Sequence, residues 1–182
     1  MSEFPELLAL EPARLHARLR WLNCLPLQVA QEAFLNCCGS SKWAEAMARA
    51  RPFEDLSEIV RTIHRSFDGL AEADWKEAFA AHPKIGEAAV RGGEPAQRWS
   101  RQEQSAAMIS SSEGQSRLQR HNEEYYSRFG YIFIICATGK STEQVLGAIE
   151  SRLMNDPIAE FEIAAGEQRK ITLLRIQKMI AS

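Results

Sequence analysis

Apolar residues recur at helical spacing along most of the chain. After Asp55 the apolar positions are three and four residues apart, at Leu56, Ile59, Val60, Ile63 and Phe67. This period places them on one face of an amphipathic helix. Ser141 begins a second such segment, and both starts have capping-box spacing, with Glu58 and Gln144 three residues on. From Pro157 a long helix is expected to continue to the C-terminus.

Shorter helices are predicted from composition and from the residues at their ends. Segments 27–36 and 42–50 are rich in Ala, Glu, Gln and Arg, which favour helix, and Gly39-Ser40-Ser41 between them can end one helix and cap the next. Residues 74–80 predict a short helix that ends at His82-Pro83, because the residue before a proline is disfavoured in helical backbone.

One apolar run, Tyr131–Ala137, is rich in β-branched and aromatic residues instead. No partner strand is evident elsewhere, so we interpret the run as a buried helix start or an extended connector. The Gly- and Pro-containing stretch between Gly86 and Ser100 predicts a loop. The predicted fold is therefore all-α, and 182 residues are most simply one domain, 1–182, in which 1–22 form an N-terminal extension or a first helix.

Charge and composition exclude several classes of protein. The chain has 22 Lys and Arg against 24 Asp and Glu, a balance that argues against binding to nucleic acid or to an anionic membrane surface. No apolar stretch is long enough for a transmembrane helix, and the N-terminus lacks the pattern of a signal peptide. The four cysteines have no metal-site spacing, so we expect reduced thiols, no metal and a cytoplasmic location.

His82 is the histidine that the sequence best suits for chemistry. The proline and glycine of His82–Gly86 fix an irregular backbone, and imidazole exchanges protons near neutral pH. Spacing alone favours a capping or core histidine instead. Ser100 and Glu103 have capping-box spacing, which explains both residues structurally, although a helix N-terminus also binds anions. Arg175 lies one turn after Ile171, near the apolar stripe of the last helix. There its side chain either extends its charge to solvent or faces a pocket and binds a carboxylate with two N–H groups.

Five short blocks of sequence occur in a specific order. They are Gly39–Phe53, His82–Gly86, Ser100–Gln104, Arg128–Ala137 followed by Gly139-Lys140, and Lys170–Thr172 with Leu174-Arg175. Taken together they resemble the 2-oxo-4-hydroxy-4-carboxy-5-ureidoimidazoline (OHCU) decarboxylase family of urate degradation. The resemblance implies a single-domain helical bundle of the OHCU decarboxylase type.

The resemblance also implies an activity and a set of site residues. It implies a cofactor-free homodimer, a carboxy-lyase, that converts OHCU to (S)-allantoin and CO2 and is linked functionally to urate oxidase and hydroxyisourate hydrolase. The family's catalytic histidine falls on His82 and its acidic partner on Glu103. Substrate contacts carry over to Pro83, Ser100, Arg101, Gln102, Gln104, the backbone of Phe133, Ile134, Ile135, Cys136 and Ala137, and Arg175. The peroxisomal tail of some eukaryotic relatives is missing, which favours a cytoplasmic enzyme.

The implied chemistry suits these residue types. Loss of CO2 leaves electron density that an adjacent C=N group absorbs, so no pyridoxal or metal electron sink is required. His82, held by Glu103, is expected to protonate the ring carbon or first to handle the substrate hydroxyl. Arg175 would hold a substrate oxygen, and Ser100 and Gln104 the ureido arm. One alternative is a non-catalytic helical ligand-binding or scaffold domain; a metal hydrolase is disfavoured because no third ligand is apparent.

Overall fold

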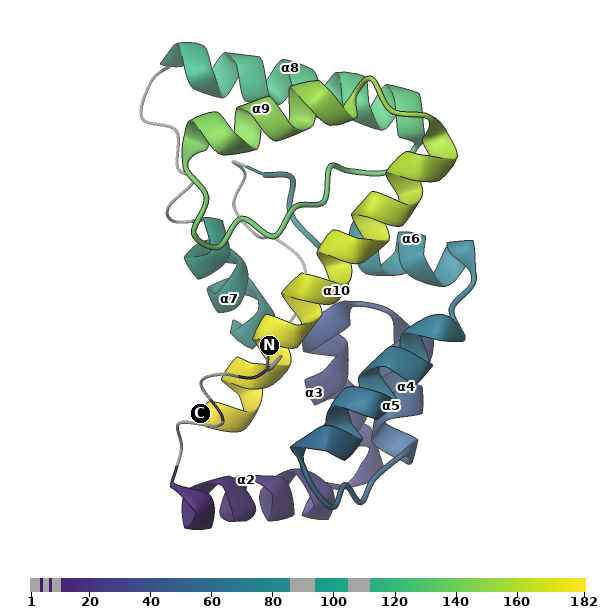
Figure 1. The fold of residues 1–182 in the computed structure, drawn as a ribbon, viewed down its shortest axis with the longest axis vertical. Helices are drawn as coiled ribbons and strands as arrows, with labels where there is room; N and C mark the ends of the chain where they lie inside the picture. The colour runs from purple at the N-terminus through teal and green to yellow at the C-terminus, as the bar shows by residue number, and fades with distance from the viewer. Residues whose placement is uncertain (1–3, 5–6, 8–10, 86–93, 105–111) are drawn as a thin grey trace. The chain divides into compact units, whose positions relative to one another are not determined.

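The described part of the chain folds mainly into α-helices (Figure 1). The computed structural model describes residues 4, 7, 11–85, 94–104 and 112–182, with the backbone alone at 100–104 and 112–113. The helices are α2 (Pro12–Cys24), α3 (Leu27–Cys38), α4 (Ser41–Arg49), α5 (Leu56–Asp68), α6 (Glu72–Ala80), α7 (Glu94–Gln104), α8 (Ser112–Phe129), α9 (Thr142–Arg152) and α10 (Pro157–Ala181). No strand occurs within these described ranges, which confirms the all-α prediction.

Two compact units make up the structure. The first comprises residues 1–77 and 171–182, and therefore contains α2 to α5, most of α6 and the C-terminal part of α10. The second comprises residues 78–170, with the end of α6, helices α7 to α9 and the first part of α10. The expectation of one domain over 1–182 stays a prediction.

Capping interactions set the ends of several helices where the sequence predicts them. At the start of α5 the Asp55 carboxylate accepts a hydrogen bond from the Glu58 N–H, at 2.7 Å. Ser141 and Gln144 form a complete capping box at the start of α9. Helix α3 ends at Cys38 and is capped by Gly39, whose φ of 87° is the left-handed conformation that glycine adopts without strain.

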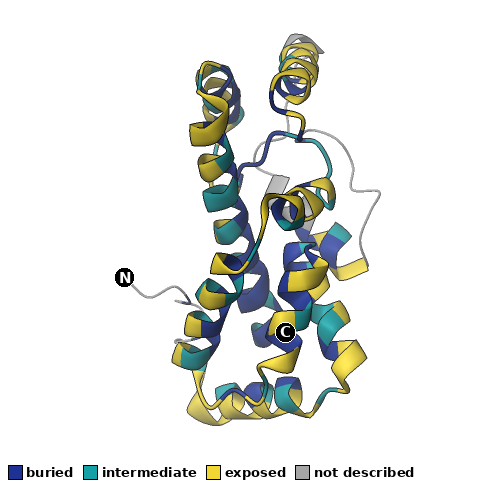
Figure 2. Cartoon of the chain, turned by 90° about the vertical axis from the view of Figure 1, so that its right-hand side faces the viewer, coloured by how far each residue is buried: buried dark blue, intermediate teal, exposed yellow. Residues whose placement is uncertain are grey.

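The first unit has an aromatic core. The Trp43 ring lies 6.1 Å from Phe34 and 5.3 Å from Phe67, and Phe67 stacks on Trp75 at 5.1 Å. All four rings are buried. Figure 2 shows buried and exposed residues on different faces of the helices, as the apolar period predicts.

The second unit has a ring cluster around Tyr125 of α8. The centroids of Phe129, Tyr131 and Phe133 lie 4.6, 5.9 and 5.2 Å from that of Tyr125. Phe79, near the end of α6, lies 5.2 Å from Tyr131. The end of α6 therefore packs against the start of the apolar run 131–137, although the two are about fifty residues apart in sequence.

The predicted loop between Gly86 and Ser100 is wrong in its second half. Helix α7 begins at Glu94, so Ser100 lies well inside a helix. Pro95 explains the early start, because a proline in the first helical turn has no N–H to leave unpaired and its fixed φ suits a helix. Residues 86–93 lie outside the described part of the chain.

Candidate active site

His82 lies on a turn directly after α6. Its backbone N–H donates to the Phe79 C=O at 3.1 Å, and the rigid ring of Pro83 follows it. The Ile85 C=O at the other end of the turn accepts from Asn122 Nδ2 of α8, at 3.2 Å. The imidazole is half-buried, with its Nε2 atom out of contact with solvent. The turn is thus tied down at both ends, which restricts the position of the histidine.

The apolar run 131–137 lies between α8 and α9 and has neither helix nor strand (Figure 1). Of the two interpretations of this run, the connector is therefore confirmed and the helix start is wrong. Within it Phe133, Ile134, Ile135 and Ala137 are buried, and Cys136 is half-buried. The Ile134 C=O accepts from Arg152 at 2.8 Å, and the Cys136 N–H donates to Glu167 at 2.7 Å. The connector is therefore held by side chains of α9 and α10.

Two residues of the connector have backbone N–H and C=O groups that can still form hydrogen bonds. In the described structure the N–H and C=O groups of Phe133 and Ile135 form no hydrogen bond, although both residues are buried. Buried backbone groups in folded proteins are nearly always paired. The unpaired donors and acceptors are therefore suited to a polar ligand that itself carries N–H and C=O groups.

Arg152 belongs to a buried hydrogen-bond network. The fully buried Glu160 carboxylate accepts from Arg152 Nε at 2.8 Å, from Asn155 Nδ2 at 2.7 Å and from the Tyr125 hydroxyl. Burial, and then the hydrogen bond to Glu160, raise the pKa of the Tyr125 hydroxyl, which therefore stays protonated and donates. The Arg152 guanidinium also lies 4.6 Å from the centre of the Phe133 ring.

Helix α7 carries the second block of predicted site residues. The backbone of Ser100, Arg101, Gln102, Glu103 and Gln104 forms its C-terminal part. Their side chains lie outside the described structure, so their contacts, including the pairing of Glu103 with His82, stay predictions. The capping-box interpretation of Ser100 and Glu103 is wrong, because the helix begins six residues before Ser100 and its N-terminus is not there.

Arg175 lies on the part of α10 that belongs to the first unit. Only 4% of the residue is exposed, so it does not extend its charge to solvent. The Cys38 thiol lies within its electrostatic reach and contacts the Thr172 side chain. Burial raises the pKa of this thiol to about 11. His82 and the connector belong to the second unit, and a shared contact of Arg175 with the substrate stays a prediction.

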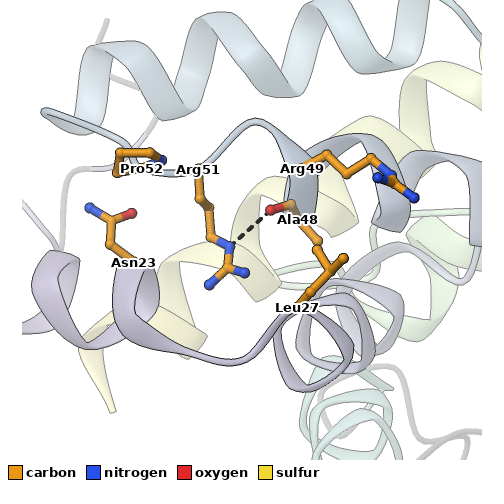
Figure 3. Close-up of a pocket in the computed structure, with 6 residues that line it drawn as sticks. All are labelled: Asn23, Leu27, Ala48, Arg49, Arg51 and Pro52. Atoms are coloured by element: carbon orange, nitrogen blue, oxygen red, sulfur yellow. Dashed lines mark hydrogen bonds between the residues drawn. The ribbon is translucent and has the colours of Figure 1, made fainter.

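A cavity of about 360 Å³ in the first unit is lined by none of the predicted site residues (Figure 3). Its walls are Asn23, Leu27, Ala48, Arg49, Arg51 and Pro52. The Arg51 guanidinium donates to the Ala48, Leu22 and Leu25 carbonyls at 3.0, 2.6 and 2.8 Å. These carbonyls lie at helix ends, where they have no helical partner. The Arg51 guanidinium therefore stabilises the C-terminal ends of α2 and α4.

Metal sites, membrane-spanning helices and disulfides are three further features for which we searched the described ranges. There, no group of three or more His, Cys, Asp or Glu side chains is arranged to hold a metal ion. Nor does any described helix combine the length and apolar character needed to cross a membrane. All four cysteines are free thiols: Cys37 and Cys38 are buried, Cys136 is half-buried and Cys24 is exposed.

The fold has a close counterpart among solved structures. A structure described as a crystal structure of OHCU decarboxylase in the presence of (S)-allantoin superposes with a TM-score of 0.71 and 35% sequence identity. The match covers 83% of this chain and 99% of that one, so the fold is that of a helical decarboxylase. A sequence model of the family described as OHCU decarboxylase matches residues 23–177. The chain belongs to the OHCU decarboxylase family.

Two curated relatives show how much of such proteins the chain represents. The uric acid degradation bifunctional protein TTL of Arabidopsis thaliana is 35% identical over 159 residues, 86% of this chain but 49% of that protein. The 2-oxo-4-hydroxy-4-carboxy-5-ureidoimidazoline decarboxylase of Amia calva is 31% identical over 164 residues, 89% of this chain and 94% of that protein. The chain therefore spans about half of the bifunctional protein and nearly all of the Amia calva decarboxylase.

The sequence does not reveal the contacts that three charged residues make in this region, namely those of Arg152, Glu160 and Glu167. Glu167 and its partner Cys136 are 31 positions apart, and Arg152 and Ile134 are 18 apart. The one signal is that Arg152 falls three residues after Ile149, on the apolar face of its helix. A charged residue on such a face requires a buried partner.

Proposed function

We propose that this chain decarboxylates OHCU to (S)-allantoin in urate degradation, with His82 as general acid and base. The family match over residues 23–177 supports it, as do the decarboxylase relatives that the chain covers almost completely. The structural observation that carries the proposal is the pair of features in the second unit. A fixed histidine turn and a buried connector with available N–H and C=O groups provide proton transfer and amide recognition.

The reaction requires orientation and a proton rather than an electron-withdrawing cofactor. When the C–CO2 bond breaks, its electron pair moves toward the adjacent C=N group of the ring. The ring nitrogen of that C=N group takes up one proton. The hydroxyl on the carbon that lost CO2 then gives up its proton as a carbonyl forms, and the carbon that bears the ureido group gains one. Delivery of that proton to a single face determines the S configuration. We assign this delivery to His82, with Glu103 holding the imidazole.

The substrate presents ureido and ring-amide groups, which carry N–H donors and C=O acceptors as a peptide does. The unpaired backbone groups of Phe133 and Ile135 are complementary to them. We assign the remaining substrate contacts to the other carried-over positions: Pro83, Ser100, Arg101, Gln102, Gln104 and Arg175. In this assignment Arg175 holds a substrate oxygen as a charged donor.

The assembly and setting of the enzyme belong to the same proposal. We infer a homodimer in the cytoplasm that consumes the product of hydroxyisourate hydrolase, which in turn acts on the product of urate oxidase. The support is membership of the family. Light scattering at micromolar concentration tests the dimer, and the mass of a single chain would contradict it.

A coupled assay tests the activity. Urate, urate oxidase and hydroxyisourate hydrolase generate OHCU, and circular dichroism follows the appearance of optically active allantoin. The wild-type chain should accelerate that signal, and His82→Gln should lower the rate by about 10²–10⁴-fold, the usual contribution of general acid–base catalysis. His16→Gln, on the exposed surface of α2, is the matched control and should keep the wild-type rate.

Two results would contradict the proposal in different ways. If His82→Gln kept wild-type turnover with enantiopure product, the assigned role of His82 would be wrong. If the wild-type chain failed to accelerate formation of optically active allantoin, the non-catalytic binding domain would be favoured instead.

A further inference from the structure

Two charged side chains hold the connector at successive peptide groups. Arg152 Nη1 of α9 donates to the Ile134 C=O at 2.8 Å. Glu167 Oε2 of α10 accepts from the Cys136 N–H at 2.7 Å. All of these residues lie in the second unit. Between the two bonds lies Ile135, whose own N–H and C=O are unpaired in the described structure.

Because the peptide group is planar, the two hydrogen bonds also determine how the N–H and C=O groups of Ile135 are oriented. The Ile134 C=O shares one peptide plane with the Ile135 N–H, and the Cys136 N–H shares the next with the Ile135 C=O. In a trans peptide the N–H and the C=O of one plane point in opposite directions. Arg152 and Glu167 therefore orient both free groups of Ile135, and each group points away from the side chain that binds its peptide plane.

Glu167 is suited to hold a backbone group firmly. Its side chain is 13% exposed, and its second oxygen binds Lys170 Nζ at 2.5 Å, one turn further along α10. A hydrogen bond to an ionised carboxylate is shorter and roughly twice as strong as one between neutral groups. The carboxylate is thus held by Lys170 on one side and aimed at the Cys136 N–H on the other.

We propose that Glu167 is a positioning residue for the decarboxylation, because it orients the Ile135 C=O toward the ureido or ring-amide group of the substrate. Glu167 acts through the backbone and does not touch the substrate. Arg152 performs the corresponding role for the Ile135 N–H. The inference rests on the proposed function, since it assigns the free groups of Ile135 to that substrate.

The experiment uses Glu167 because its replacement leaves no buried charge. Arg152, by contrast, also pairs with the buried Glu160, so its loss would destabilise the fold. Glu167→Gln keeps a side-chain oxygen that accepts from Cys136, whereas Glu167→Ala removes it. Glu162→Ala is the matched control, because it deletes an exposed carboxylate from the same helix.

In the coupled assay Glu167→Ala should raise KM about tenfold, the effect of losing one charge-assisted hydrogen bond, with a smaller change in kcat. Glu167→Gln should stay within about threefold of wild type, and Glu162→Ala should equal it. A purely structural role predicts a lower melting temperature in Glu167→Ala with an unchanged KM. Wild-type KM in Glu167→Ala would overturn the proposal.

A second measurement does not depend on turnover. In a ¹⁵N-labelled chain, Glu167→Ala should shift the Cys136 amide resonance and weaken the binding of (S)-allantoin about tenfold, and Glu167→Gln should restore both. Unchanged allantoin affinity in Glu167→Ala would refute the positioning role. A wild-type chain that binds allantoin in this Glu167-dependent way but does not decarboxylate OHCU would refute the proposed function alone.

Discussion

Replacement of Arg152 by methionine should destabilise the second unit strongly. Methionine matches much of the length and apolar volume of the arginine stem but has no guanidinium. The change leaves the Glu160 carboxylate, which is 0% exposed, without its hydrogen bonds from Arg152 Nε and Nη2. It also removes the donor from the Ile134 C=O.

The magnitude follows from the burial of the partner that remains. Breaking a buried ion pair by removing one member typically costs about 3–5 kcal/mol, because an uncompensated charge stays in the interior. Asn155 and Tyr125 still donate to Glu160, so we expect about 3 kcal/mol, the lower end of that range. The double variant Arg152→Met with Glu160→Met removes both charges and should recover most of the loss.

Urea unfolding followed by circular dichroism and tryptophan fluorescence measures the free energy of unfolding. Lys76→Met is the control, because Lys76 and Glu72 form an exposed pair on α6, with an N–O distance of 2.7 Å. Such a pair contributes about 0.5 kcal/mol or less. A loss below about 1 kcal/mol in Arg152→Met, or no recovery in the double variant, would show that the buried network does not stabilise the fold as reasoned.

Two further predictions concern a helix end and a thiol. Ser141→Ala should lower the free energy of unfolding by about 1 kcal/mol in urea, because it removes one half of the capping box of α9; unchanged stability would count against that cap. At pH 8 the exposed Cys24 should react with iodoacetamide well before Cys38, as peptide mass spectrometry would show. Burial raises the pKa of Cys38 from 9.0 to about 11, so its stability contribution is complete below pH 9 and is lost as the pH rises toward 11. Labelling of Cys38 should increase over that same range, and equal rates for the two thiols at pH 8 would contradict this.

The predicted helices agree with the structure where local signals set their ends. Asp55 caps α5 and Ser141 begins α9, because a cap depends on side chains within three or four residues. The loop prediction is wrong over 94–99, which belong to helix α7. The glycines before Glu94 and the proline at 95 predict a loop, but a proline in the first turn of a helix is compatible with that helix.

In the candidate site, too, the sequence predicts what depends on local signals and misses what depends on distant residues. The sequence predicts His82 on an irregular turn and the apolar run 131–137 as parts of the candidate site, because proline, glycine and the apolar run are visible in the residue order. The roles of Arg152 and Glu167 were not. Each acts on a backbone group that is distant in sequence, and no periodicity encodes such a pair.

The sequence by itself determined the helical class, the ends of several helices, such as the starts of α5 and α9, and, through five ordered blocks, the family to which the chain belongs. These depend on interactions within one or two helical turns or on the identity of short motifs. Only the tertiary structure decided which charged side chains are buried together and which peptide groups of the connector form hydrogen bonds with them. The packing of α8, α9 and α10 in the second unit brings Tyr125, Arg152 and Glu160 into contact, and that packing is a property of whole helix faces rather than of any single segment.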